Sequence, residues 1–143
     1  MRLVEVLAAG SLLLAGGSLF IAALTFSKNT RVRRAEWLLK LYEKYYEDEE
    51  RKRIRRALDG PVKASLIENL KSESDPDALE SFADYLNFFE FLGSLVEMNQ
   101  IKKDEVRMMF DYYVRQLDDE GIKTFCSEQG YENTLKLVKT VPS

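Results

Sequence analysis

The fold depends on residues 77–98, which read DALESFADYLNFFEFLGSLVEM. Their apolar side chains repeat at helical spacing and form two adjacent stripes, Leu79, Phe82, Leu86, Phe89 and Val96 on one and Tyr85, Phe88, Leu92 and Leu95 on the other. A helix that is apolar on two sides needs neighbours on both sides. Asp75 and Pro76, just before it, are typical of an N-cap and a first helical position. This stretch therefore predicts the central helix of a bundle.

The segments on either side keep the same 3.6-residue period, and none alternates as a strand would. A helical run from residue 35 is expected to stop at Gly60-Pro61, a strong helix breaker. Shorter helical segments are expected near residues 62–70, 104–117, 122–126 and 135–138. We predict an all-α fold with a helical bundle of five or six segments in residues 35–143.

An N-terminal membrane helix is indicated by residues 6–26, a run of 21 positions without a charge. A helix needs about 20 apolar residues to cross a bilayer, whereas the apolar core of a signal peptide holds about 7–15. Four cations follow the run, and the positive-inside rule places such a flank in the cytoplasm: Lys28, Arg31, Arg33 and Arg34. We predict a single transmembrane helix at 1–27, a basic collar at 28–34 that contacts lipid headgroups, and a cytoplasmic domain at 35–143. The N-terminus would lie outside.

Small residues within this run recur at spacings of three and four, which places them on one helix face: Ala8, Ser11, Ala15, Ser18, Ala22 and Thr25. Small side chains let membrane helices approach closely, and hydroxyl groups can hydrogen-bond between them. The face predicts self-association into a homo-oligomer, and a pore would need several copies because one span cannot form a channel. The alternative is that such residues are simply frequent in membrane helices.

The composition excludes several classes of enzyme. The chain has no histidine and one cysteine, Cys126, so a zinc site with four Cys or His ligands and a Ser–His or Cys–His catalytic pair are excluded. Neither a GxxxxGKS/T phosphate loop nor a GxGxxG turn occurs. We predict no catalytic, cofactor-binding or metal-binding residues, and we expect Cys126 to be a small buried apolar residue.

The densest basic run is a candidate contact surface and consists of Arg51, Lys52, Arg53, Arg55 and Arg56. Clustered cations can neutralise nucleic-acid phosphates, and they can equally contact lipid or the acidic surface of a protein partner. We favour a third interpretation, a solvated helix face paired with the acidic residues just upstream. A second polar face, Asn87, Glu90, Ser94 and Glu97, is predicted to be solvated or to lie between subunits.

Four segments carry a resemblance to a known family: RRAEWLLKLYEKYYEDEERKRIRRALDG (33–60), DYLNFFEFLGSLVE (84–97), FDYYVRQLDD (110–119) and EQGYENTLKLVK (128–139). The chain resembles a group of small bacterial proteins known only as a domain of unknown function. That resemblance implies one helix in the bacterial inner membrane and a cytoplasmic helical domain, and it brings no catalytic residues.

In architecture the chain is also similar to the membrane accessory protein of type VI CRISPR systems. That protein has one N-terminal span and a helical domain of the HEPN class, and it assembles into a ring-shaped pore. HEPN nucleases use an Arg-x4–6-His motif, which this chain lacks because it has no histidine. The similarity therefore implies a degenerate HEPN-like scaffold without nuclease activity, on analogy of fold.

Two functions are carried forward as hypotheses. The first is a non-enzymatic, self-associating membrane protein that acts as an oligomeric effector or pore, with an accessory role in CRISPR-type antiphage defence. The alternative is a membrane-tethered helical adaptor that binds a cytoplasmic protein partner. A nuclease or other enzyme is the least favoured.

Overall fold

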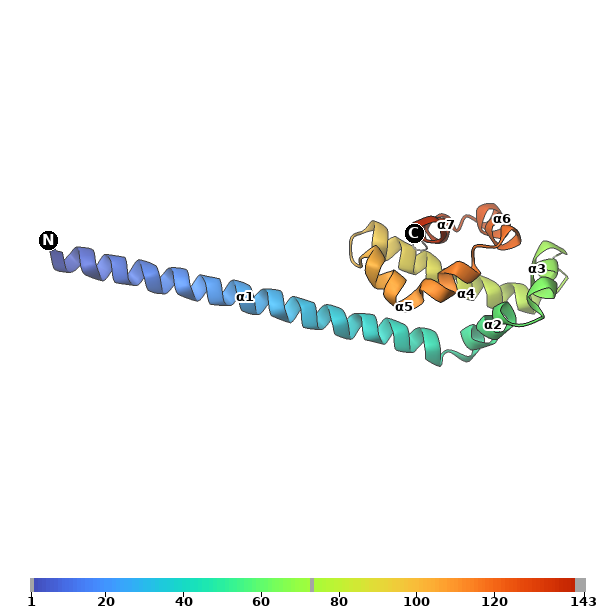
Figure 1. The fold of residues 1–143 in the computed structure, drawn as a ribbon, viewed down its shortest axis with the longest axis horizontal. Coiled ribbons are helices and arrows are strands. Elements are labelled where there is room, and N and C mark those ends of the chain that lie inside the picture. Colours follow the sequence, from blue (N-terminus) through green and yellow to red (C-terminus); the bar gives the residue numbers. More distant parts are fainter. Residues whose placement is uncertain (1, 73, 141–143) are drawn as a thin grey trace. The chain divides into compact units, whose positions relative to one another are not determined.

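The computed structural model describes the backbone of residues 2–72 and 74–140, and the side chains of residues 24–26, 28–70, 72 and 74–140. All regular structure in these residues is α-helical, which confirms the predicted all-α class (Figure 1). The helices are α1 (Arg2–Glu47), α2 (Glu49–Asp59), α3 (Lys63–Ser72), α4 (Pro76–Glu97), α5 (Lys103–Gln116), α6 (Glu120–Gln129) and α7 (Glu132–Thr140). The chain divides into two compact units, Met1–Leu41 and Tyr42–Ser143.

The N-terminal unit consists of α1 up to Leu41. The collar residues Lys28, Arg31 and Arg33 have exposed side chains, and Arg34 is half-buried. Among the residues whose side chains the structure describes, no helix is long and apolar enough to cross a bilayer. Most of the predicted span at 6–26 lies outside these side chains, and so do all the predicted self-association residues except Thr25, which is exposed.

The C-terminal unit is built around α4, as the sequence predicts. Asp75 accepts a hydrogen bond from the Ala78 backbone N–H at 3.1 Å, and Pro76 occupies the first turn. Both predicted stripes of α4 supply core residues, because Phe82, Tyr85, Leu86, Phe88, Phe89, Leu92 and Leu95 are buried. The helix packs most extensively against α7 and also contacts α2 and α3 (Figure 1).

The helical run expected from residue 35 to Gly60 is in fact two helices, which corrects the prediction. Asp48 separates α1 from α2, and its carboxylate accepts a hydrogen bond from the Arg51 backbone N–H at 2.9 Å. This N-cap satisfies a donor that would otherwise lack a partner at the start of α2. The predicted end of the run is confirmed, since α2 stops at Asp59 and Gly60 follows as its C-cap.

The polar face of α4 is not solvated throughout, because α7 covers part of it. The Glu90 carboxylate accepts hydrogen bonds from the backbone N–H groups of Asn133 at 3.2 Å and Thr134 at 2.9 Å. It therefore caps the N-terminus of α7 from another helix. Gly93 lies beside this contact, and a Cβ atom there would sit 2.6 Å from the Asn133 carbonyl oxygen. The prediction of a solvated or intersubunit face is wrong for Glu90 and Ser94, whose hydroxyl accepts from the Asn133 amide at 3.1 Å.

Candidate binding groove

Helix α2 contains the whole predicted basic run. Some of these residues lie on the helix face that packs against the core, and the others lie on the exposed face. Arg55 is only 8% exposed. Its guanidinium donates to the carbonyl oxygen of Tyr45 at 2.8 Å and to that of Tyr46 at 3.3 Å. These carbonyls belong to the last turn of α1 and have no partner within that helix. Arg55 therefore caps α1, and the expectation of a solvated face is wrong for this residue.

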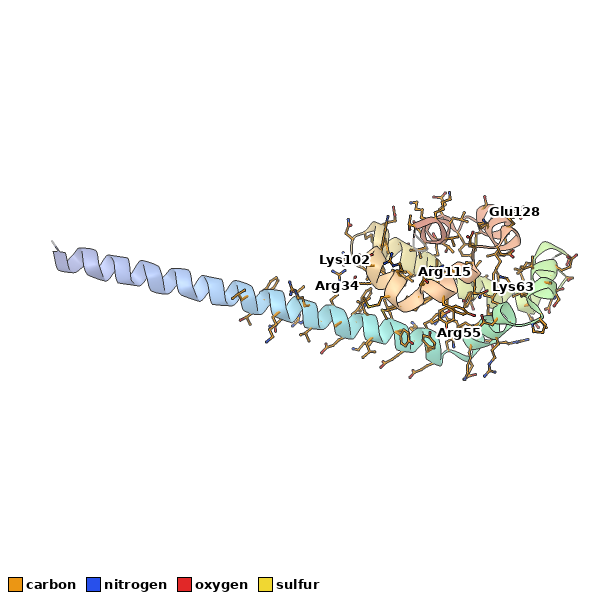
Figure 2. All side chains as sticks on the ribbon, viewed as in Figure 1. Arg34, Arg55, Lys63, Lys102, Arg115 and Glu128 are labelled. Carbon is orange, nitrogen blue, oxygen red and sulfur yellow. The ribbon has the colours of Figure 1, made fainter. Side chains whose placement is uncertain are left out.

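Arg55 is also surrounded by aromatic rings. Its guanidinium carbon lies 4.8 Å from the ring centroid of Tyr45, 4.6 Å from that of Tyr46 and 5.8 Å from that of Tyr113. The negative face of each ring attracts the cation and replaces part of its lost hydration. Figure 2 labels Arg55 at the start of the domain, beside the C-terminal turn of α1.

The hydroxyls of Tyr45 and Tyr85 are neutral structural groups. Tyr45 and Tyr85 are fully buried, and their hydroxyl oxygens lie 3.0 Å apart in a hydrogen bond. Burial raises the pKa of both tyrosines far above the usual value, because a phenolate would lose its hydration there. Neither hydroxyl can serve as a base near neutral pH.

Arg51 is held in a similar way. Its Nη1 donates to the Lys44 carbonyl oxygen at 3.1 Å, and its guanidinium carbon lies 5.2 Å from the centroid of Phe88. The Asp48 carboxylate is 3.7 Å away. Arg51 and Arg55 thus hold the end of α1 against α2, and they are not presented to a phosphate backbone.

The remaining basic residues of α2 border an open groove. Arg53 and Arg56 are exposed, and together with Glu49, Glu50, Ala57 and Val62 they line a hollow of about 560 Å³. Arg53, Ala57 and Val62 also line an adjoining hollow of about 160 Å³. The further residues of that second hollow are Ile54, Ser65, Leu66, Asn69, Ala78 and Ser81. We call the two hollows the α2–α3 groove.

Among the described residues, the acidic side chains along this groove have polar partners, whereas its two arginines do not. Glu49 is paired with Lys52 at 3.0 Å, as the favoured interpretation of a paired face predicted. The Glu50 carboxylate accepts a hydrogen bond from the Ser81 hydroxyl at 3.1 Å. By contrast, Arg53 and Arg56 make no hydrogen bond or ion pair with any residue that the structure describes. The groove therefore presents two guanidinium groups beside an apolar floor.

Groups that could bind a metal ion or act as a nucleophile were the remaining candidates for chemistry. Among the described residues, no group of three or more His, Cys, Asp and Glu side chains could hold a metal ion. Cys126 is buried, as predicted, and burial raises the pKa of its thiol to about 12. A thiol with that pKa is a poor nucleophile near neutral pH, because the thiolate is the reactive form.

Sequence reasoning found the arginines of the groove but not its floor. Ala57 and Ala78 are small residues on helices distant in sequence, and nothing in their local pattern distinguishes them from other surface alanines. Val62 follows the Gly60-Pro61 break and is 51% exposed. That exposure was visible only once α2 and α3 were placed.

Comparison with known proteins identifies a family but no characterised relative. Neither the curated proteins nor the solved structures contain a match to the chain. A family model matches residues 12–119, which extend from α1 through α5 and include all the residues of the α2–α3 groove. The resemblance to a domain of unknown function is thereby confirmed for all its segments except 128–139, which lies beyond the match. The chain belongs to the family described as Domain of unknown function (DUF4760).

Proposed function

We propose that this protein is a non-enzymatic, membrane-tethered adaptor whose C-terminal unit binds a cytoplasmic protein partner. The α2–α3 groove is the observation that carries the proposal. It exposes Arg53, Arg56 and Val62 together, although α2 uses its other two arginines to build the fold. Exposed cations beside an apolar floor are typical of protein-binding surfaces, where arginine is enriched.

The tether is supported by the sequence. Residues 6–26 carry no charge, and Lys28, Arg31 and Arg33 follow with exposed side chains. These features favour a single span in the bacterial inner membrane, with the collar at the anionic cytoplasmic surface and the N-terminus outside.

Site-specific photo-crosslinking in the cells that make the protein tests this function. A photoreactive residue in place of Val62 should give one discrete adduct with a different protein, found in the membrane fraction after alkaline washing. The same residue in place of Arg107, an exposed position on α5, is the matched control and should give none. Full-length protein in the soluble fraction would contradict the tether, and adducts only at whole multiples of the chain mass would contradict the adaptor.

Self-association is the second candidate, and the small-residue face from Ala8 to Thr25 favours it. In this proposal several copies form a membrane effector or pore, with an accessory role in CRISPR-type antiphage defence that rests on analogy of the architecture predicted from the sequence. Dye leakage from liposomes tests it together with the variants Ser11→Leu and Ser18→Leu. Leakage that both variants leave unchanged would count against the face, and a monomeric mass in detergent would rule out a pore.

A further inference from the structure

We infer that the α2–α3 groove binds an amphipathic helix of the partner protein, with two carboxylates about one turn apart on its polar edge. The inference rests on the proposed adaptor function and specifies the chemistry of the bound segment. Two properties of the groove support it: the spacing of its arginines and the apolar nature of its floor.

The arginines define the charge pattern of the ligand. Arg53 and Arg56 are three residues apart on α2, so their side chains project from the same face one turn apart. Neither has an internal acceptor among the described residues. A guanidinium binds a carboxylate through two parallel hydrogen bonds. Two carboxylates three or four residues apart on a helix would match both arginines at once.

The floor defines the apolar face of the ligand. Ala57 and Ala78 have small side chains, which let another helix approach closely. Val62 lines the same hollow and is half exposed to solvent. Ile54 and Leu66 are buried and close the floor from below. The two hollows, of about 560 Å³ and about 160 Å³, share Arg53, Ala57 and Val62, and their apolar side chains suit the apolar stripe of a helix.

The small number of free arginines disfavours nucleic acid as the ligand. Proteins that bind a nucleic-acid backbone commonly make about 6–10 phosphate contacts, whereas α2 offers two unpaired arginines here. Arg51 and Arg55 cannot add to that number without releasing the end of α1.

Selection from a displayed library of 16-residue peptides tests the inference, with the full chain in uncharged detergent as the target. We expect enriched peptides to share an apolar stripe and two Asp or Glu residues three or four positions apart. Their affinity should fall at least about tenfold for the double variant Arg53→Glu, Arg56→Glu. The matched control, Lys103→Glu with Arg107→Glu, makes the same charge change on exposed positions of α5 and should leave affinity unchanged.

A charge exchange completes the experiment. Replacing the two acidic residues of a selected peptide with lysine should abolish binding to the natural chain and restore it to the Arg53→Glu, Arg56→Glu variant. The inference would be overturned by selected peptides that lack an acidic pair, or by equal affinity of a peptide for the Arg53→Glu, Arg56→Glu variant and for the α5 control. It would also be overturned if a 16-nucleotide RNA bound more tightly through the same arginines, or if a second copy in the groove doubled the particle mass. If a discrete adduct still forms from position 62, the adaptor function stands and only the helical ligand is rejected.

Discussion

Replacement of Arg55 by methionine should destabilise the C-terminal unit strongly, although the change removes a single charge. Methionine has a similar length and can fill the space, so the loss comes from polar contacts rather than from a cavity. The carbonyl oxygens of Tyr45 and Tyr46 lose their donor, and the three cation–π contacts disappear.

The magnitude follows from these contacts. Hydrogen bonds to a charged group contribute about 1.5–3 kcal/mol each, and a cation–π contact contributes about 0.5–2 kcal/mol when it is partly desolvated. The natural chain also bears the desolvation cost of burying Arg55, which offsets part of this gain. We expect a net loss of about 3 kcal/mol, a large share of the roughly 5–15 kcal/mol that stabilises an ordinary domain.

Urea unfolding of the full chain in uncharged detergent measures this loss. The near-UV circular dichroism of the tyrosine cluster reports on the C-terminal unit, because Tyr45, Tyr46, Tyr85 and Tyr113 pack together there. Arg53→Met is the matched control on the exposed side of α2 and should change stability by less than about 0.5 kcal/mol. If both variants unfold at the same urea concentration, Arg55 does not cap α1 and the division of the basic run is refuted.

Three further variants or reagents test the C-terminal unit. Gly93→Ala should destabilise it by about 1–3 kcal/mol in the same urea assay, because the new Cβ would meet the Asn133 carbonyl oxygen at 2.6 Å. Glu90→Gln should speed amide hydrogen exchange throughout α7 about tenfold, since the Thr134 N–H loses a charged acceptor. Cys126 should react with maleimide at pH 8 only after unfolding, because a pKa of about 12 leaves the folded thiol almost wholly protonated.

Each of these expectations has a contradicting outcome. Gly93→Ala with natural stability would mean that α7 moves away from α4 without cost. Glu97→Gln is the control for Glu90, because Glu97 also contacts α7, through Lys136 at 3.2 Å, but on the exposed side. Equal exchange rates for the two variants would reject the capping role. Complete labelling of the folded chain within minutes would show that Cys126 is accessible.

Local sequence signals predicted the elements that depend on neighbouring residues. The two apolar stripes of α4, its Asp75 cap with Pro76, and the end of α2 at Gly60-Pro61 are all confirmed. In each case the decisive contacts lie within a few residues, so periodicity and capping chemistry are sufficient. The break at Asp48 was missed because its acidic neighbours also read as good helix-forming residues, and only the cap geometry distinguishes it.

The candidate groove was predictable only in part. The five cations of α2 were found from the sequence, but their roles depend on partners far along the chain, such as Tyr113 for Arg55 and Phe88 for Arg51. A run of cations looks uniform in sequence, whereas a helix turns its members toward different surroundings. Arg51 and Arg55 face backbone carbonyl groups and aromatic rings and pack against them. Arg53 and Arg56 face the solvent and remain exposed.

The sequence by itself determined the helical class, the central position of α4, the uncharged run at 6–26 with its basic collar, and the lack of histidine chemistry. These properties follow from composition and short-range periodicity. Only the tertiary structure decided that Arg55 and Arg51 cap α1, that Glu90 caps α7, and that Arg53 and Arg56 are left beside an apolar floor. The reason is physical: a buried charge is stable only where hydrogen-bond partners surround it, and those partners are brought together only when the chain folds.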